Sequence, residues 1–420
     1  MASALAILFD AGPLRTVAGA VAAALALASI VRSGGMIRAF ALALGAASAA
    51  LVALDADPHA ALVGLEQAGL FCAFLAGLYA LRSGVESNPS LGAVRGRLRD
   101  LPRETRRGVL LWLGWLFSVP LVIGALSVVA PLIAEDADTD TRTEAATWSI
   151  RGMALTLLFS PFTVAMGLVT SLGPAVPFPA ILSSGLALSL AALLAPLATG
   201  ACRSPLAAER AVWIDVGRVL APVLVLIILV VAASGWFGWS TLEASVVLVA
   251  PFAAGMVTAT GNRARRQAAI RSTRIGWGRF DSEVAVLTSA LVFAALAADS
   301  ATVLAAMDAA AEWIGPGGLV VASLGAICLL SMIGVHMAVP AVVVLSVFGP
   351  LMPDSLSALL LCLAVLIGWA FGAMTGLGSI SFLVATTIFR VPPRRAAFGP
   401  NLTFMTGLCA LYALGVFILI

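Results

Sequence analysis

The sequence predicts an all-α polytopic membrane protein, and three observations support that fold class. Hydrophobic residues make up 61% of the 420 residues and charged residues only 11%, whereas a soluble domain carries roughly 25% charged residues. Apolar runs of about 17–25 residues recur along the chain, each long enough to cross ~30 Å of hydrocarbon. The third observation is an internal repeat.

The repeat relates the two halves of the chain. The stretch LSVVAPL at 126–132 matches LSVFGPL at 345–351, 219 residues later. At nearly the same spacing Trp148 falls opposite Trp369 and Ser160 opposite Ser379. Duplication of this kind in a membrane protein is typical of secondary transporters. We therefore predict two repeats, 1–205 and 206–420.

Ten apolar stretches are expected to cross the membrane as helices: 14–32, 36–54, 61–82, 109–133, 177–199, 212–234, 240–258, 283–304, 318–349 and 398–420. Two further apolar segments, 145–173 and 356–390, are interrupted by polar and helix-breaking residues. Connections at 82–107, 203–218, 263–279 and 390–395 are rich in Arg, and those at 55–59, 135–144 and 299–312 are acidic. The positive-inside rule counts basic residues and places the first set in the cytoplasm.

The sides assigned to the connections determine on which face of the membrane the two interrupted segments begin and end. If 109–133 runs outward and 177–199 returns, 145–173 begins and ends outside. By the same reasoning 356–390 begins and ends in the cytoplasm, unless its first arm makes a full crossing. We expect two re-entrant hairpins that open to opposite sides. The fold is then two inverted-topology repeats, each of about five transmembrane helices plus one hairpin.

The interruptions provide the candidate binding site. Pro161 cannot donate to a helix ladder and glycines such as Gly376 and Gly378 tolerate unusual backbone angles, so helices are expected to stop there. Broken backbone at membrane depth is tolerated where it lines a cavity, and a helix that starts there favours an anion. The substrate-binding candidates are the polar residues at the breaks and in the spans that follow them: Ser160, Thr163, Ser183, Ser184, Thr375, Ser379, Ser381, Asn401 and Thr403. The alternative is that these are packing positions or hydroxyls bonded within intact helices.

Coupling ions have two sequence candidates. His336 is ionisable within a long apolar stretch and precedes Pro340 by four residues, which makes it a candidate for a substrate or proton role; a neutral interhelical hydrogen bond is the alternative. Carbonyls freed near Ser160, Gly376, Gly378 and Ser379 suit Na⁺. The five cysteines show no metal-like spacing, and we find no nucleotide-binding or zinc motif. We expect no cofactor beyond Na⁺ or H⁺ as a coupling ion.

The predicted architecture resembles the ion transporter superfamily, which includes the divalent anion/sodium symporters, the gluconate permeases and the membrane subunits of tripartite transporters. GSISFLVA at 378–385 is similar to the tip sequence of the gluconate permeases, and Gly334-Val335-His336 is similar to a Gly-x-His step in several members. The Ser-Asn-Thr triplets of the sodium/dicarboxylate branch are absent. The resemblance implies an elevator mechanism, with a scaffold at 14–108 and 212–304 and transport parts at 109–200 and 318–420, often as a homodimer.

The sequence thus predicts a secondary active transporter for a small, anionic organic solute, driven by an H⁺ or Na⁺ gradient. We expect it in a bacterial inner membrane, in contact with the lipid bilayer and without nucleic acid. An ion antiporter on the same fold and a non-catalytic subunit of a larger complex are the alternatives. An intramembrane serine hydrolase built on Ser379 and His336 would leave the repeat unexplained, so we predict that the chain is not an enzyme.

Overall fold

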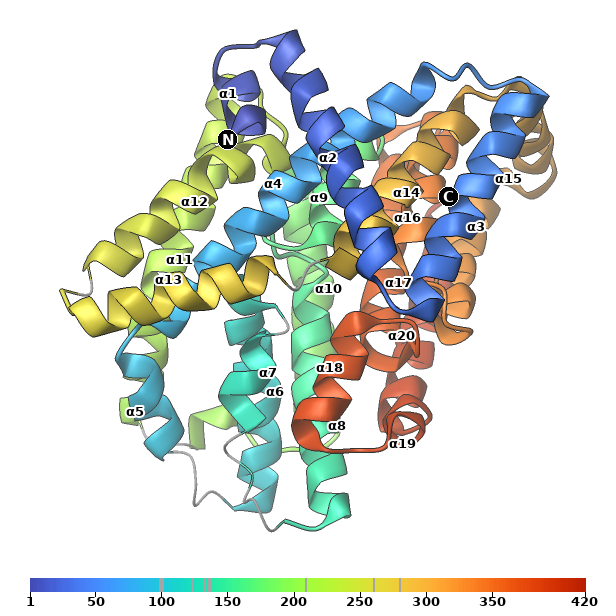
Figure 1. Cartoon of the computed structure of the whole chain (residues 1–420). Helices are drawn as coiled ribbons and strands as arrows, with labels where there is room; N and C mark the ends of the chain where they lie inside the picture. The colour runs from blue at the N-terminus through green and yellow to red at the C-terminus, as the bar shows by residue number, and fades with distance from the viewer. Residues whose placement is uncertain are drawn as a thin grey trace.

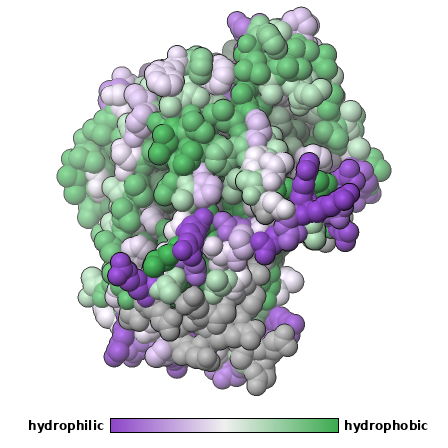
Figure 2. Space-filling model, turned by 90° about the vertical axis from the view of Figure 1, so that its left-hand side faces the viewer, coloured by the Kyte–Doolittle hydropathy of each residue, from purple (hydrophilic) through white to green (hydrophobic). Residues whose placement is uncertain are grey.

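The fold is entirely helical within the part of the chain that the computed structural model describes: residues 1–97, 102–122, 124–130, 133, 137–207, 210–259, 261–278 and 281–420. Among these described residues, ten helices are long and apolar enough to cross a membrane. The chain is therefore an all-α polytopic membrane protein, as its composition predicts. Figure 2 shows a largely hydrophobic surface over the upper part of the molecule, with hydrophilic side chains gathered in a band below it.

One group of helices packs around α4 (Ala60–Glu86), and we call this group the scaffold. Its other members are α1 (Ala2–Leu8), α2 (Gly12–Arg32), α3 (Gly35–Leu54), α11 (Arg210–Phe237), α12 (Thr241–Ala259) and α14 (Asp281–Asp299). Glycines bring α4 close to its neighbours, since a Cβ at Gly64 would meet the backbone of Leu291 and one at Gly69 that of Ala18. Small residues at such crossings are the usual means of packing helices in membranes. Two shorter helices, α5 (Ser90–Arg97) and the Arg-rich α13 (Arg263–Trp277), flank the scaffold (Figure 1).

The remaining helices form a second group, which we call the transport domain after the role that the sequence leads us to expect for it. Its first half holds α6 (Arg103–Leu121), α7 (Gly124–Val129), α8 (Thr139–Thr156), α9 (Val164–Leu172) and α10 (Phe178–Ala198). Its second half holds the part of α15 (Ala301–Met332) that follows a kink at Gly315, then α16 (Ala338–Val343), α17 (Ser355–Thr375), α18 (Ile380–Phe389), α19 (Pro393–Ala397) and α20 (Pro400–Leu419). A π turn at Val344–Phe348 and a 3₁₀ turn at Gly349–Leu351 extend α16, and the 3₁₀ turn Pro205–Ala207 joins the halves.

Ion pairs show on which face each connection of the first half lies. Glu144, near the start of α8, pairs with Arg103 and Arg107 at the start of α6, and Asp140 pairs with Arg395 at 2.6 Å. The acidic 137–144 connection therefore lies on the same face as these arginines, which we call the Arg-rich face. At the other end of this segment, Leu172 shares a cavity with Ala60 and Asp299, on the opposite face. The expectation that 135–144 lies outside is wrong for its described residues; Glu135 and Asp136 lie outside them.

This placement exchanges the roles of two predicted elements. The segment 145–173 is a full crossing, made by α8 and α9 with a break between them. The predicted span 109–133 is instead a hairpin, in which α6 rises from the Arg-rich face and α7 turns back against it. The error has a physical cause. Acidic residues carry little information about sidedness, and here they follow the arginines as ion-pair partners.

The same exchange occurs in the second half. The predicted span 318–349 breaks at 333–337, between α15 and α16, and its end returns to the opposite face, where Ser346 lies near Leu172 and Asp299. The segment 356–390 crosses the membrane as α17 and α18, since its far end leads to Arg395 on the Arg-rich face. In the described ranges the fold thus has ten crossings and two hairpins that open to opposite faces, with each hairpin placed before the broken crossing of its half.

Candidate functional site

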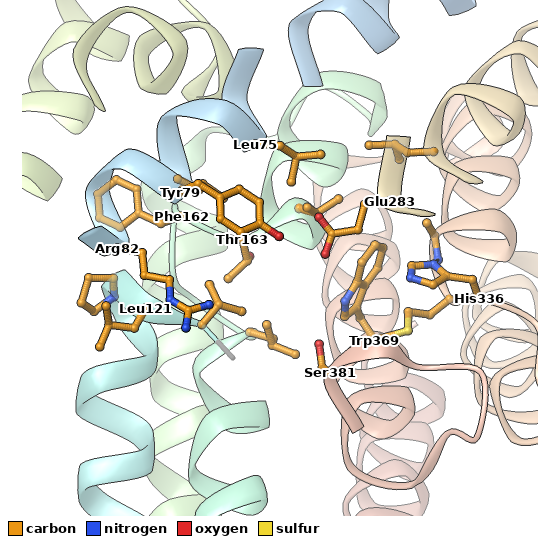
Figure 3. Close-up of a pocket in the computed structure, with 18 residues that line it drawn as sticks. Leu75, Tyr79, Arg82, Leu121, Phe162, Thr163, Glu283, His336, Trp369 and Ser381 are labelled. Carbon is orange, nitrogen blue, oxygen red and sulfur yellow. The ribbon is translucent and has the colours of Figure 1, made fainter. Parts of the chain in front are cut away.

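A cavity of about 140 Å³ lies where both breaks, both hairpin tips and the scaffold meet (Figure 3). The first hairpin contributes Pro120–Val122, and the first break contributes Phe162 and Thr163. The second half contributes His336–Ala338, Trp369 and Ser381, and the scaffold contributes residues of α4 and α14. Its volume is close to the ~150 Å³ that accommodates benzene, so it suits a small organic molecule.

The first break is built from buried hydrogen bonds. Thr156 donates its hydroxyl to the carbonyl of Trp115 at 2.8 Å, and Ser160 donates its hydroxyl to that of Val119 at 3.0 Å. From α10, Ser189 donates at 2.8 Å to the carbonyl of Leu155, which also accepts a hydrogen bond from the Leu158 amide at 3.3 Å. These bonds join the break to the first hairpin and to α10. Backbone groups that a broken helix frees at membrane depth must find such partners.

The second break relies on close backbone contact. A Cβ at Gly378 would overlap the backbone of Gly334, which has a φ of 101° in the tip of the second hairpin. Glycine at 378 lets the break and the tip approach this closely, whereas glycine at 334 is required by the positive φ. Ser379 then caps α18 by accepting a hydrogen bond from the Phe382 amide at 3.3 Å. The contact places His336 and Ser381 at the same cavity.

His336 is held as a neutral ring in this structure. The backbone amide of Ala338 donates to its Nδ1 at 3.2 Å. An amide can only donate, so Nδ1 must lack a hydrogen and Nε2 must carry one. The ring also meets Trp369 edge to face, with 6.3 Å between the ring centroids. His336 therefore offers an N–H donor to the cavity that it lines.

The scaffold brings both signs of charge to the cavity. Arg82 and Tyr79 come from α4, and Glu283 comes from α14 (Figure 3). Arg82 donates to Glu86 at 2.9 Å and packs over Gly124 of the first hairpin, where a Cβ would meet the guanidinium. The sequence assigned Glu283 only to a helix start, and Arg82 only to a cytoplasmic connection. Neither position carries a local signal for a cavity, since both depend on how the transport domain sits against the scaffold.

The structure brings three of the predicted site residues together at the cavity: Thr163, Ser381 and His336. Ser160 and Ser379 are buried in the two breaks, and Thr375 donates back to the Phe371 carbonyl of its own helix at 2.9 Å. The others lie outside the cavity lining: Ser183 and Thr403 are exposed, Ser184 is half-buried, and Asn401 is buried beside Arg151. Their binding roles stay predictions, as does a Na⁺ site near Ser160, Gly376, Gly378 and Ser379.

Arg151 is a buried cation in α8 that the sequence reading overlooked, because it treated His336 as the ionisable group of the apolar regions. The isolated charge within 145–173 was a usable signal. Its side chain lies between the rings of Trp148 and Phe404, 4.8 and 4.2 Å from their centroids. It donates to the Asn401 side-chain oxygen at 3.0 Å and to the Pro400 carbonyl at 3.4 Å.

The described part of the chain contains neither a cluster of metal ligands nor a hydrogen-bonded serine–histidine pair at Ser379 and His336. No group of three or more His, Cys, Asp or Glu side chains could hold a metal ion there. No hydrogen bond joins Ser379 to His336 there either, since the first caps α18 and the second accepts from Ala338. A serine–histidine pair for hydrolysis is therefore not assembled in this structure.

Comparison with known proteins gives one line of evidence. No protein-family model and no curated protein match this sequence. A solved structure of the YdaH transporter from Alcanivorax borkumensis, described as having an unusual topology, matches 91% of this chain and 96% of its own, with a TM-score of 0.55 and 14% sequence identity. The two proteins share a fold. The chain thus has the fold of a multi-pass membrane protein of this kind, and its function, substrate and mechanism are matters for proposal.

Proposed function

We propose that this protein is a secondary active transporter that carries a small anionic organic solute by an elevator movement, driven by an H⁺ or Na⁺ gradient. The observation that supports it best is the cavity, which both repeats line and which lies at the boundary between two groups of helices. In this proposal the transport domain carries the solute past the scaffold, and residues 1–205 and 206–420 are inverted repeats of the ion transporter superfamily type.

The position of the cavity along the scaffold supports movement. Arg82 lies nine residues beyond the middle of α4, and Glu283 lies seven residues from the middle of α14, both toward the Arg-rich end. Leu75 and Leu287 of the same lining lie only two and three residues from these middles, so at 1.5 Å per residue the centre of the cavity is roughly 8 Å from the middle of the scaffold. Figure 1 agrees, because the lower ends of α8, α18 and α19 lie well below α13. We interpret this arrangement as the state open toward the cytoplasm.

The cavity chemistry favours an anion. The helices α9 and α18 begin at it, and helix N-termini carry partial positive charge. The Nε2–H of His336 and the guanidinium of Arg82 add donors. In our proposal the solute's carboxylate binds between Thr163, Ser381 and His336, and its apolar part packs on Trp369.

An ion antiporter is the second candidate, and Glu283 is the observation that favours it. A carboxylate that lines an intramembrane cavity is the group that proton exchange needs. Replacing it by Gln tests this candidate: a Na⁺/H⁺ or K⁺/H⁺ exchange in proteoliposomes that is lost in the Glu283→Gln variant would favour the antiporter. Solute uptake that survives the substitution would favour our main proposal.

Cysteine accessibility tests alternating access. In a background without the five native cysteines, Ser381→Cys or Thr163→Cys is labelled with an impermeant maleimide from each face of right-side-out and everted vesicles. We expect labelling from both faces, because the cavity exchanges between them. Labelling from one face under every condition would overturn the elevator proposal.

Substrate class follows from a second assay. Small carboxylates from acetate to benzoate are screened for an increase in thermal stability, since a ligand that binds the folded protein stabilises it. Those that stabilise are then tested by counterflow in proteoliposomes with imposed H⁺ and Na⁺ gradients. We further propose a homodimer formed through the scaffold, in a bacterial inner membrane.

A further inference from the structure

Arg151 is charged and buried, and its surroundings lack a compensating acid. The residue is 6% exposed. Its hydrogen-bond partners are an amide oxygen and a backbone carbonyl, and its ring contacts are neutral. None of the acidic side chains in the described ranges pairs with it. A buried charge without an ion-pair partner is costly, so its presence calls for a role.

Arg151 also belongs to the moving part of the proposed elevator. It lies eleven residues into α8 from Asp140, or roughly 16 Å from that end of the helix. Its contacts, Asn401 and Phe404, are on α20 of the same domain. The described acids of the transport domain lie near its two ends: Glu104, Asp138, Asp140 and Glu144 at the Arg-rich end, and Asp354 at the start of α17.

We propose that Arg151 is a fixed positive charge that the transport domain carries through the membrane, so that the membrane potential acts on the empty transporter and a monoanionic solute cancels that effect. This inference rests on the elevator proposal and adds the charge of the substrate to it. The neutral state of His336 is consistent with it, because the empty domain then carries one buried charge and the loaded domain none.

The direction of the effect follows from the sign of the charge. A potential that is negative at the Arg-rich face pulls Arg151 toward that face, so the empty transporter stays open to the cytoplasm. Binding of a monoanion removes the net charge, and the loaded domain then moves without opposition from the potential. The membrane potential would thereby act on the movement of the empty transport domain and not on that of the loaded one.

The size of the effect can be estimated. A movement of about 10 Å through ~30 Å of hydrocarbon crosses about a third of the field. One elementary charge moved through that fraction changes the ratio of the two states by about fourfold per 100 mV. A neutral transport domain would show no such change.

The test uses the empty protein, with Ser381→Cys in the cysteine-free background. Right-side-out and everted vesicles are clamped at different K⁺ diffusion potentials with valinomycin, and the rates of labelling by an impermeant maleimide are measured. We expect the ratio of cytoplasmic to external labelling to rise about fourfold per 100 mV of inside-negative potential. We call the change of this ratio with membrane potential the slope. Arg151→Lys keeps the charge and should keep the slope, whereas Arg151→Gln should abolish it.

A matched control variant is included, and the results that would contradict the role of Arg151 differ from those that would contradict the elevator. Arg32→Gln removes an exposed arginine of the scaffold, which does not move, and should leave the slope unchanged. A flat slope in the parent protein with labelling from both faces would overturn the role of Arg151 and leave the elevator standing. A full slope in Arg151→Gln would do the same. Labelling from one face at every potential would overturn both.

Discussion

The two helix breaks have the same place in their repeats and are built differently. The first is enclosed by side-chain hydrogen bonds from α6, α8 and α10, and Ser160 at its centre is fully buried. The second is held by glycine backbone pressed against the tip of the second hairpin, so that Ser381 after the break and His336 in the tip both line the cavity. We infer that the first break mainly anchors the domain and that the second carries more of the solute chemistry.

The largest effect is expected at the glycine contact of the second break. In Gly378→Ala the new methyl group would overlap the Gly334 backbone and force the tip and break apart. We expect a loss of about 3 kcal/mol of stability, measured by thermal unfolding, and altered labelling of Ser381→Cys. Gly407→Ala is the control, because nothing lies within 4 Å of its new Cβ. An unchanged melting temperature in Gly378→Ala would show that the contact is dispensable.

Removing a hydroxyl from the first break should lower the stability of the folded protein. Ser160→Ala leaves the Val119 carbonyl without the side-chain donor that now reaches it. We expect a cost of about 1–2 kcal/mol in unfolding free energy. Ser183→Ala is matched to it, since that exposed hydroxyl bonds only back to Ala180 of its own helix, and should be neutral. Equal effects in the two variants would argue against an anchoring role for the first break.

A change in the hairpin tip that packs on the second break should weaken binding of the solute and leave the stability of the protein nearly unchanged. His336→Asn keeps an acceptor near the Ala338 amide and removes the Nε2–H donor. For a carboxylate that stabilises the parent protein, we expect roughly tenfold weaker affinity, as for one hydrogen bond to a charged group. Isothermal titration measures it, and unchanged affinity would place the solute away from His336.

The smallest effect is expected outside the membrane, where the scaffold meets the start of α15. Ser300 and the Thr302 amide donate to Asp55, and these hydrogen bonds hold the pKa of its carboxyl below its usual range. The folded pKa is depressed, so this contribution to stability is present above about pH 4 and is lost as the pH falls through the folded value. Asp55→Asn should slightly lower the melting temperature at pH 7 and weaken its decline below pH 4. An identical acid profile would remove Asp55 from this role.

Much of the architecture was readable from the sequence, and the misread part has a definite cause. Composition and length predicted the helical membrane fold, and the Ser160–Ser379 match located both helix breaks. The number of crossings and hairpins also agrees with the structure. The hairpins were exchanged with the broken crossings because the acidic 135–144 stretch was treated as evidence of sidedness. Its described acids instead follow Arg103, Arg107 and Arg395.

The candidate site was readable only in its transport half. Helix-breaking residues and hydroxyls marked Thr163 and Ser381, and an isolated imidazole marked His336. Arg82 and Glu283 lie near the ends of ordinary-looking spans, and they meet the cavity because of where the transport domain rests along the scaffold. That position depends on domain packing, which no local pattern in the sequence specifies. Arg151 differs, because a lone arginine in an apolar segment is a visible signal.

Movement of the transport domain past the scaffold is best tested by a distance. Spin labels are placed at Ile270→Cys on α13 and Phe398→Cys beside α19, which are exposed positions on the two groups of helices. In lipid nanodiscs, pulsed electron resonance should show two distance populations that differ by on the order of 10–20 Å, and a stabilising carboxylate should change their ratio. A single distribution, the same with and without the carboxylate, would contradict the elevator.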